Sequence, residues 1–380
     1  MKSQVALVRC NGYEEQRVAE AVARGMGLLG GMPAFLRPEE RIVLKPNILV
    51  GDAPEKLISP HPLVFKAVAG LARVVTPNLS YGDSSAVGRP AGNMRRAGYA
   101  ELARELGIPL ADFEGGRQVQ FKDSPFVKRF TLANGAVDAD GLISISKLKT
   151  HGLMRFTGAV KNQFGCVPGM LKAECHITQP NVLDFAGMLV CLSLYLRPRL
   201  YVMDAVTAMQ GNGPRAGSAK RMNALLFSAD PVALDATACR MIDLDPAFVP
   251  TMGPGRDWGL GTFDPAEIEL LGDPLDTFIQ KDFDVVRAPV RPASSAGRGL
   301  VRNLISPRPV MDETRCKSCG TCVTHCPASP KAIAWRDGDQ KTPPIYHYGR
   351  CIRCFCCQEL CPKAAISVTT PLLGRLFGRQ

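Results

Sequence analysis

The stretch CKSCGTCVTHCP (residues 316–327) decides the fold of the last part of this chain. Its cysteines are separated by two, two and three residues, and a proline follows the last one. The same spacing begins again 35 residues later, in CIRCFCCQELCP (residues 351–362). Apolar residues follow both copies, at 332–333 and 364–366. This repeat predicts a small domain built from two similar halves.

Cysteine thiolates at this spacing are typical ligands of iron–sulfur clusters. In two-cluster ferredoxins, three cysteines of a run bind one cluster and the fourth binds the other. The repeat therefore predicts two [4Fe–4S] clusters, with one ligand exchanged between the runs. The ligand sets are Cys316, Cys319, Cys322 and Cys361 for one cluster, and Cys351, Cys354, Cys357 and Cys326 for the other. The alternative is a zinc site, which usually needs only two separated Cys-x2-Cys pairs.

The remaining cysteines favour a reducing compartment over a disulfide framework. Nine of the 14 cysteines fall between Cys316 and Cys361, and the others are scattered along the chain. A secreted disulfide scaffold is usually short and rich in cysteine throughout. Cys356 breaks the repeat, and because Cys361 fixes the register at Cys357, we interpret Cys356 as a packed thiol beside the cluster.

Composition and charge limit the classes of partner. The formal charge is +11, and two clusters of about −2 each would leave roughly +7. A basic surface attracts acidic proteins or small anions, but no run of Lys and Arg stands out, so we expect no nucleic-acid partner. The longest apolar run, Phe185–Leu196, is too short to cross a bilayer. No signal peptide is recognisable, and we expect a cytoplasmic protein without a transmembrane segment.

The first 280 residues alternate between strand-like and helix-like segments. Predicted strands include Val5–Arg9, Gly141–Ser146 and Leu200–Asp204, and predicted helices include Glu14–Leu29 and Asn181–Leu196. Such alternation predicts an α/β domain with a mostly parallel sheet and helices on both faces. A small α+β ferredoxin-like two-cluster domain follows it.

The predicted domain boundaries follow changes in composition. Residues 1–280 form the α/β domain, 281–311 a linker rich in Pro and Arg, and 312–369 the ferredoxin domain. Residues 370–380 form a basic tail. We interpret the tail as a frayed end or as a weak contact with a membrane surface or a partner.

Several polar motifs recur along the first domain. They are Leu44-Lys45-Pro46-Asn47, Gly82-Asp83-Ser84-Ser85, Lys147-Leu148-Lys149-Thr150-His151-Gly152, Ala159-Val160-Lys161-Asn162-Gln163-Phe164-Gly165, Gly211-Asn212-Gly213-Pro214 and Asp230-Pro231-Val232-Ala233-Leu234-Asp235. In order and spacing they resemble the family filed as domain of unknown function 362, whose members are iron–sulfur proteins when a ferredoxin domain is attached. The resemblance implies this architecture but no reaction.

Polar and glycine-rich motifs follow several predicted strands of the α/β domain. Ligands bind at the carboxyl ends of strands in open parallel sheets, so these motifs predict a polar site. Its lysines predict an anionic ligand, either a substrate or a further small anionic cofactor. The glycine loops could present N–H groups to that anion or be plain turns. The candidate residues are Lys45, Asn47, Asp83, Ser84, Lys147, Lys149, Lys161, Asn162, Asp204, Gly211 and Gly213.

A shorter segment, from His151 through Lys161 to His176, is similar to part of the nickel-pincer lactate racemase family. That likeness implies a lysine that holds a pincer nucleotide and histidines that serve the metal and proton transfer. The racemase has no ferredoxin domain. Two alternatives stay open, namely histidines with hydrogen-bonding roles and a proton-transfer site without the pincer.

Three functional hypotheses follow. The first is an iron–sulfur oxidoreductase, in which the clusters exchange electrons with an anionic substrate near the candidate catalytic residues Lys161, His151 and His176. The second is an electron carrier or maturation protein that docks a redox partner without catalysis. The third is a racemase-like or isomerase-like activity with clusters as redox sensors. A pocket that collects these residues and faces the clusters would favour the first hypothesis.

Overall fold

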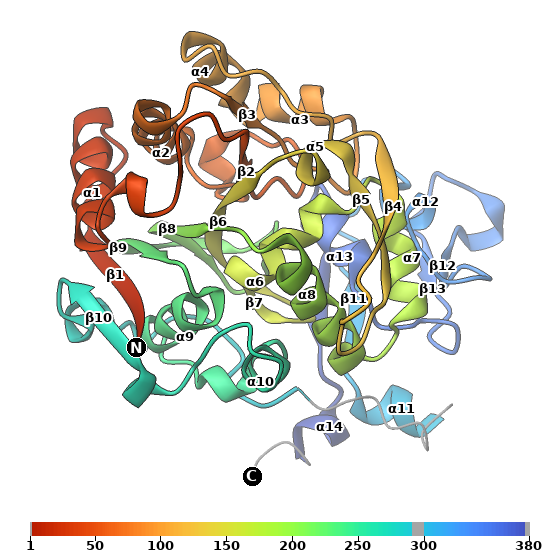
Figure 1. Ribbon diagram of the computed structural model, residues 1–380. Helices are drawn as coiled ribbons and strands as arrows, with labels where there is room; N and C mark the ends of the chain where they lie inside the picture. The colour runs from red at the N-terminus through yellow and green to blue at the C-terminus, as the bar shows by residue number, and fades with distance from the viewer. Residues whose placement is uncertain (1, 291–299, 377–380) are drawn as a thin grey trace.

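The computed structural model describes residues 2–290 and 300–376 (Figure 1). The larger part is built around an eight-stranded sheet. Its strands lie in the order β10 (Ile268–Gly272), β1 (Ser3–Arg9), β9 (Ser218–Ser228), β8 (Leu200–Gln210), β6 (Gly141–His151), β2 (Ile42–Pro46) and β3 (Leu79–Tyr81), and β7 (Arg155–Thr157) pairs with β6.

The sheet is mixed but mostly parallel. The strands β8, β6, β2 and β3 run parallel to one another, as do β1 and β10. Strand β9 runs antiparallel to both of its neighbours, and the short β7 antiparallel to β6. The predicted α/β fold with a mostly parallel sheet is confirmed.

Helices cover both faces of this sheet because alternate residues of each strand point to opposite sides. In β1, Val5 and Leu7 join one apolar core, and Ala6 and Val8 join the other. The first core lies under α6 (Ala159–Asn162), α8 (Val182–Leu196), α9 (Pro231–Met241) and α10 (Met252–Asp257). The second lies under α1 (Glu15–Leu28), α2 (Pro62–Val75), α3 (Pro90–Arg96) and α4 (Tyr99–Glu105).

The two central strands are longer than the sequence predicts. Strand β6 continues past Ser146 to His151, and β8 continues past Asp204 to Gln210. Beyond those points β7 pairs with the end of β6, and β9 pairs with the end of β8. The polar residues predicted to follow the strands therefore lie within them.

The smaller part has two short antiparallel strand pairs, as expected of a ferredoxin-like domain. Strand β11 (Arg308–Met311) pairs with β14 (Ile366–Thr369), and β12 (Ile333–Ala334) pairs with β13 (Ile345–Tyr346). Two short helices, α12 (Thr321–Thr324) and α13 (Cys356–Leu360), lie within the two cysteine runs. Figure 1 shows this domain beside the sheet, and α7 (Leu171–Thr178) lines a cavity together with residues of this domain. A separate hairpin of β4 (Gly116–Gln120) and β5 (Arg129–Ala133) belongs to the larger part.

The segment predicted as a linker contains ordered structure in its described parts. Its end forms β11 of the ferredoxin-like domain, preceded by α11 (Leu300–Ile305). Near its start, Phe283 is buried against the larger domain, and Arg287 donates hydrogen bonds to the carbonyls of Ile242 and Phe283. Residues 291–299 lie outside the described residues. In the predicted tail, α14 spans Leu372–Leu376, and residues 377–380 also lie outside.

Across the described ranges, 2–290 and 300–376, no helix has the length and apolar character needed to span a bilayer.

Candidate functional site

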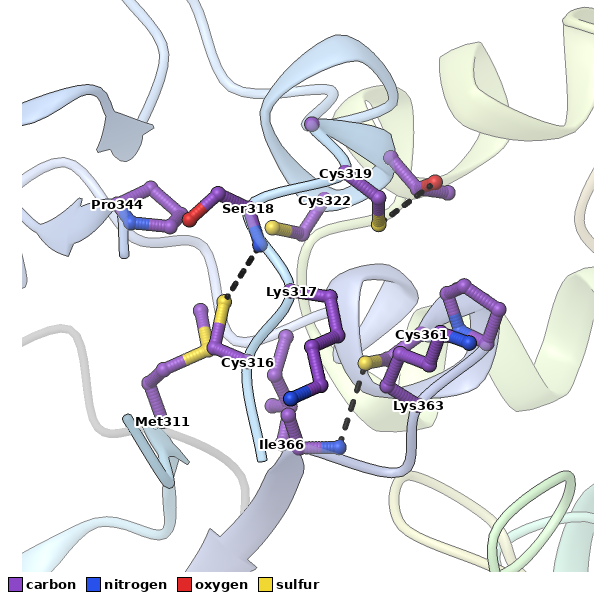
Figure 2. A pocket seen from close by; sticks show the side chains of 14 residues that line it. Met311, Cys316, Lys317, Ser318, Cys319, Cys322, Pro344, Cys361, Lys363 and Ile366 are labelled. Carbon is purple, nitrogen blue, oxygen red and sulfur yellow. Dashed lines mark hydrogen bonds between the residues drawn. The ribbon is translucent and has the colours of Figure 1, made fainter. Parts of the chain in front are cut away.

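Four cysteines from the two runs line one cavity of the ferredoxin-like domain (Figure 2). Cys316, Cys319 and Cys322 come from the first run, and Cys361 is the last cysteine of the second run. The sequence repeat predicts this same set as the ligands of one cluster. We call this space the first cysteine cavity.

The second predicted set is also brought together. Cys326 packs with Cys351 in one small apolar cluster, although 25 positions separate them in the sequence. Burial raises the pKa of the Cys351 thiol, and the nearby thiols of Cys354 and Cys326 raise it further. The structure thus places the fourth cysteine of each run with the other run.

Hydrogen-bond donors point at several of these sulfurs. The backbone N–H groups of Ser318 and Ala365 donate to Cys316 Sγ and Cys361 Sγ over 3.4 and 3.3 Å. Ala332 N–H donates to Cys326 Sγ over 3.4 Å. Such bonds stabilise thiolates and tune the potential of iron–sulfur clusters. Cysteines at this spacing, with N–H donors at their sulfurs, therefore fit [4Fe–4S] clusters.

In the α/β domain, two of the four predicted lysines are neutralised by buried carboxylates. Lys45 Nζ lies 2.7 Å from Asp83 Oδ1, and Lys147 Nζ lies 2.8 Å from Asp204 Oδ2. All four side chains are almost completely buried. Lys45 also donates to Asn162 Oδ1 over 3.0 Å. Each of these two lysines therefore faces a carboxylate that lies far from it in the sequence.

Lys149 and His151 occupy the end of β6. Lys149 Nζ donates a hydrogen bond to the carbonyl of Ile58, and burial holds its pKa well below the usual range. His151 Nδ1 accepts from Leu153 N–H over 3.1 Å, while Nε2 lies 3.0 Å from Glu359 Oε1. Neither Nε2 nor this carboxylate oxygen makes a well-aligned hydrogen bond among the described residues. His151 thus links the α/β domain to α13 rather than facing a cavity.

The loop Gly211-Asn212-Gly213-Pro214 has a different role from the predicted anion cradle. Gln358 Nε2 donates to Asn212 Oδ1 over 2.8 Å and to the carbonyl of Gly213 over 2.9 Å. Asn212 Nδ2 donates to the carbonyl of Ile366 over 3.0 Å. At Gly213, a Cβ would lie 2.4 Å from the carbonyl oxygen of Thr150, so only glycine fits. This loop docks the ferredoxin-like domain onto the α/β domain.

The Asp83-Ser84 turn is likewise occupied by internal bonds. Asp83 Oδ2 accepts from Ile48 N–H over 2.7 Å, and burial raises the pKa of this carboxyl although Lys45 opposes the shift. Ser84 N–H donates to the carbonyl of Gly165, and Ser84 Oγ accepts from Gly169 N–H over 2.8 Å. The turn therefore positions the loop after Lys161, and its edge borders a cavity.

That cavity lies between the two domains and has a volume of about 90 Å³. This exceeds the roughly 10–15 Å³ that one water needs, so a small molecule fits. We call it the boundary cavity. Its polar lining is Asn47, Asp83, Ser84, Lys161, Lys172 and His176 from the α/β domain, and His325, Cys356 and Glu359 from the ferredoxin-like domain.

Lys161 differs from the other lysines of the predicted site. It lines the boundary cavity, is half-buried, and makes no hydrogen bond or ion pair with the residues that the structure describes. Burial lowers its pKa, and the nearby Glu359 carboxylate opposes the shift. A half-buried cation without a partner is costly unless an anion reaches it.

Asp235 fixes the position of Lys161. Its carboxylate accepts hydrogen bonds from Ala159 N–H over 2.6 Å and Val160 N–H over 3.1 Å, at the start of α6. Burial raises the pKa of Asp235 to about 7 despite these bonds. A Cβ at Gly158 would lie 2.1 Å from Asp235 Oδ1, so this close approach needs glycine.

His176 and Lys172 complete the α/β side of the cavity. The His176 ring stacks on Phe185 with centroids 4.4 Å apart, and burial lowers its pKa to about 4. His176 is therefore neutral at pH 7. Burial also lowers the pKa of Lys172 to about 8, and its Nζ donates to the carbonyl of Val167. Lys172 remains mostly protonated at pH 7.

Sequence reasoning missed the cavity residues Lys172, His325 and Glu359. Lys172 lies on a helix without a recognisable motif, so no pattern marks it. His325 and Glu359 lie within or beside the cysteine runs, where the spacing of ligands dominates the signal. Their position in the runs indicates nearness to a cluster, but not that the other domain covers them.

Comparison with known proteins agrees with the architecture. A 4Fe-4S dicluster domain matches residues 308–362, which makes this an iron–sulfur protein. The family described as Domain of unknown function (DUF362) matches residues 42–240, and the chain belongs to this family.

One curated relative and one solved structure are similar to this chain. The chain is 36% identical over 261 residues to the thylakoid-associated protein sll1697 of Synechocystis sp., with 68% of this chain and 81% of the relative covered. It is also similar to the lactate racemase apoprotein from Thermoanaerobacterium thermosaccharolyticum, at 10% identity and a TM-score of 0.41. That alignment covers 63% of this chain and 56% of the racemase chain. A likeness this distant carries no argument about function.

Proposed function

We propose that this protein transfers single electrons between two [4Fe–4S] clusters and a small anionic ligand in the boundary cavity. The observation that carries the proposal is Lys161, a half-buried cation without a protein partner in a cavity that both domains line. When bound, the clusters supply one-electron transfer at potentials that the protein tunes. The ligand set of each cluster combines three cysteines of one run with the fourth of the other.

The residues of the cavity suit recognition of an anion. Lys161 and Lys172 supply positive charge, opposed within the cavity by Glu359, since Asp83 is already paired with Lys45. The carbonyl oxygen of the Asn47 side chain is buried without a hydrogen bond to any described residue, so it can accept one from a ligand.

Two histidines in the cavity can exchange protons with a bound ligand. His325 Nδ1 lies 3.0 Å from the carbonyl of Thr321, which leaves Nε2 for the cavity when Nδ1 carries the proton. His176 is neutral at pH 7. We assign the reacting role to Lys161 and His176 and a positioning role to His151, because His151 contacts Glu359 instead of the cavity.

The second candidate is an electron carrier without its own substrate. The Gly211–Pro214 loop favours this candidate. It was predicted to bind an anion, but it holds the ferredoxin-like domain against the α/β domain instead. In that case the boundary cavity would hold water. A partner at a membrane would be in keeping with a relative named as thylakoid-associated.

Replacing Lys161 with Met separates these candidates, because the change removes the charge and keeps most of the bulk. Anaerobically purified protein is titrated by calorimetry with phosphate, sulfite, acetate and pyruvate, and native mass spectrometry identifies retained molecules. At least one anion should bind the parent protein, and Lys161→Met should weaken it by tenfold or more, about 1.4 kcal/mol. Lys122→Met, an exposed lysine of the same domain, is the matched control. If the parent protein and Lys161→Met bind the anions equally well, the ligand site is excluded and the electron-carrier function is supported.

A further inference from the structure

The surroundings of the two cysteine sets differ in access to solvent. In the first cysteine cavity, Cys319 is exposed and Cys316 is half-buried. The second set lies near the boundary cavity, which is lined by Cys356, the neighbour of Cys357, and by His325, the neighbour of Cys326. Along α13, Gln358 bonds to the Gly211–Pro214 loop and Glu359 contacts His151. The first cavity therefore opens to the outside, and the second set lies toward the boundary cavity.

Two exposed lysines line the open cavity. Lys317 lies between the first two cysteines of its run, and Lys363 follows the Cys361-Pro362 pair of the other run (Figure 2). Neither makes a hydrogen bond or ion pair with any residue in the described parts of the chain. A third cation, Arg315, is exposed one residue before Cys316.

The carboxylates near this rim already have local partners. Glu313 pairs with Arg336 at 3.7 Å, and Asp312 accepts from the hydroxyl and the N–H of Thr314. The bonds from Thr314 and the nearby Arg315 lower the pKa of Asp312, so this carboxylate keeps its charge and offsets Arg315. Lys317 and Lys363 therefore carry the unpaired positive charge that lines the cavity, next to a bound cluster of about −2. Because the cations come from both runs, the rim forms only when the domain folds.

We propose that this rim, Arg315, Lys317 and Lys363, is the docking surface for an acidic one-electron carrier protein. The inference rests on the proposed function, because it assigns the entry point of the electrons. The carrier loses one electron and the cluster of the first cavity gains it, with no bond made or broken. The second set, next to the boundary cavity, is the exit side.

The geometry favours a protein partner over a small anion. The rim cations are exposed and spread around the cavity mouth, so none is desolvated enough to hold a small ion tightly. Spread surface charges instead steer a large, oppositely charged partner and raise its association rate. Weak electron-transfer complexes use small, polar interfaces of this kind.

The test uses the full holoprotein and an acidic plant-type [2Fe–2S] ferredoxin as the probe. Binding is measured by calorimetry, and electron transfer from the reduced probe by anaerobic stopped flow. For the parent protein, affinity and rate should fall at least tenfold between about 20 mM and about 500 mM salt, because added salt shortens the screening length. The variant Lys317→Glu with Lys363→Glu should lose at least tenfold at low salt and match the parent at high salt.

A control variant carries the same change of net charge elsewhere. Lys2 and Arg104 are exposed on the α/β domain and are replaced together by Glu. This control should change binding by less than twofold. Iron and sulfide content shows whether the lysine variants disturb cluster assembly. If they do, the binding of the probe is compared instead in the double variant Lys317→Gln with Lys363→Gln. The salt dependence of the parent protein then gives an independent test of electrostatic docking.

Two results would overturn the inference. One is binding of the probe that is independent of salt, or equal in the parent and the lysine variants. The other is a changed cluster potential with unchanged binding, which would mean that the lysines only offset the charge of the cluster. Failure of the proposed function is distinguishable, because it appears in the anion titrations of Lys161→Met.

Discussion

The buried charges in the sheet differ from those in the boundary cavity. In the sheet, Lys45 and Lys147 each face a carboxylate at 2.7 and 2.8 Å, and water is excluded. In the boundary cavity, Lys161 has no direct partner within the described structure, although Glu359 and Asp83 are close enough to influence its pKa. The charges of Lys45 and Lys147 are balanced without a ligand, whereas the charge of Lys161 in the cavity has no paired carboxylate among the described residues.

This difference separates stability from function. A buried ion pair seldom adds net stability, but breaking it leaves an uncompensated charge. A cation kept without a partner carries a cost that a ligand can remove. Several lysines close together are therefore a weak sign of a binding site. A lysine indicates a ligand only when no carboxylate of the protein pairs with it.

The largest effect that tests this comparison is loss of a single cluster. Cys326→Ser should remove the cluster beside the boundary cavity, and Cys361→Ser the one in the first cysteine cavity, because each belongs to the other run's set. Each variant should keep about four of about eight irons, measured by iron and sulfide analysis. Anion binding in the boundary cavity should suffer more from Cys326→Ser. If each variant loses the cluster of its own run, the ligand sets are wrong.

Breaking a matched pair in the sheet should have the next largest effect. Asp204→Ala leaves the buried Lys147 without its carboxylate partner. It also removes the acceptor of two hydrogen bonds, from the hydroxyl of Tyr13 and from the backbone N–H of His61. The cost should be about 3–5 kcal/mol, seen as a lower midpoint of thermal or denaturant unfolding at full cluster content. The control is Asp257→Ala, which breaks an exposed pair with Arg256 and should cost less than about 1 kcal/mol. Nearly equal losses of unfolding free energy in the two variants would mean that the buried pair contributes no more to stability than the exposed pair.

The fold and the cysteine sets were predictable because their signals are local or periodic. Alternation of strands and helices predicts the α/β domain, and the repeat in 316–327 and 351–362 predicts the paired cysteines. The strand ends were not predictable in the same way. The predicted strand ends at Ser146, yet β6 continues to His151, because Asp204 and the backbone carbonyl of Ile58 bind the buried lysines.

The candidate site was predicted in part. Lys161, His176, Asn47, Asp83 and Ser84 do line one cavity with residues of the ferredoxin-like domain. Lys147 and Asp204 pair with each other, and Gly211 and Gly213 belong to the docking loop. Sequence order does not reveal which carboxylate meets which lysine, since these partners are tens of residues apart and meet only in the folded sheet.

A smaller effect should appear in the pH dependence of anion binding. Burial lowers the pKa of Lys172 to about 8, so raising the pH through 8 removes its positive charge from the cavity. Anion affinity should therefore fall severalfold between about pH 7 and about pH 9. Lys172→Arg keeps its charge in this range and should flatten the profile. An unchanged profile in Lys172→Arg would place the titrating group elsewhere.

The smallest effect is expected at Cys356, the cysteine that interrupts the second repeat. Its side chain lines the boundary cavity, whereas Cys357 Sγ accepts a hydrogen bond from Tyr346 O–H over 3.4 Å. Burial raises the pKa of the Cys357 thiol, and the nearby thiols of Cys354, Cys351 and Cys322 raise it further. The register of the sequence repeat predicts Cys357, and not Cys356, as the ligand.

Cys356→Ser should therefore retain about eight irons and the parent stability, because serine nearly matches the size of cysteine and no cluster ligand is lost. Anion affinity should change by less than about threefold, or less than about 0.7 kcal/mol, since Lys161 and Lys172 remain. The measurement pairs iron analysis with the same anion titrations, and Cys357→Ser is the matched comparison, with about four irons expected. A loss of iron in Cys356→Ser but not in Cys357→Ser would mean that Cys356, and not Cys357, is the cluster ligand.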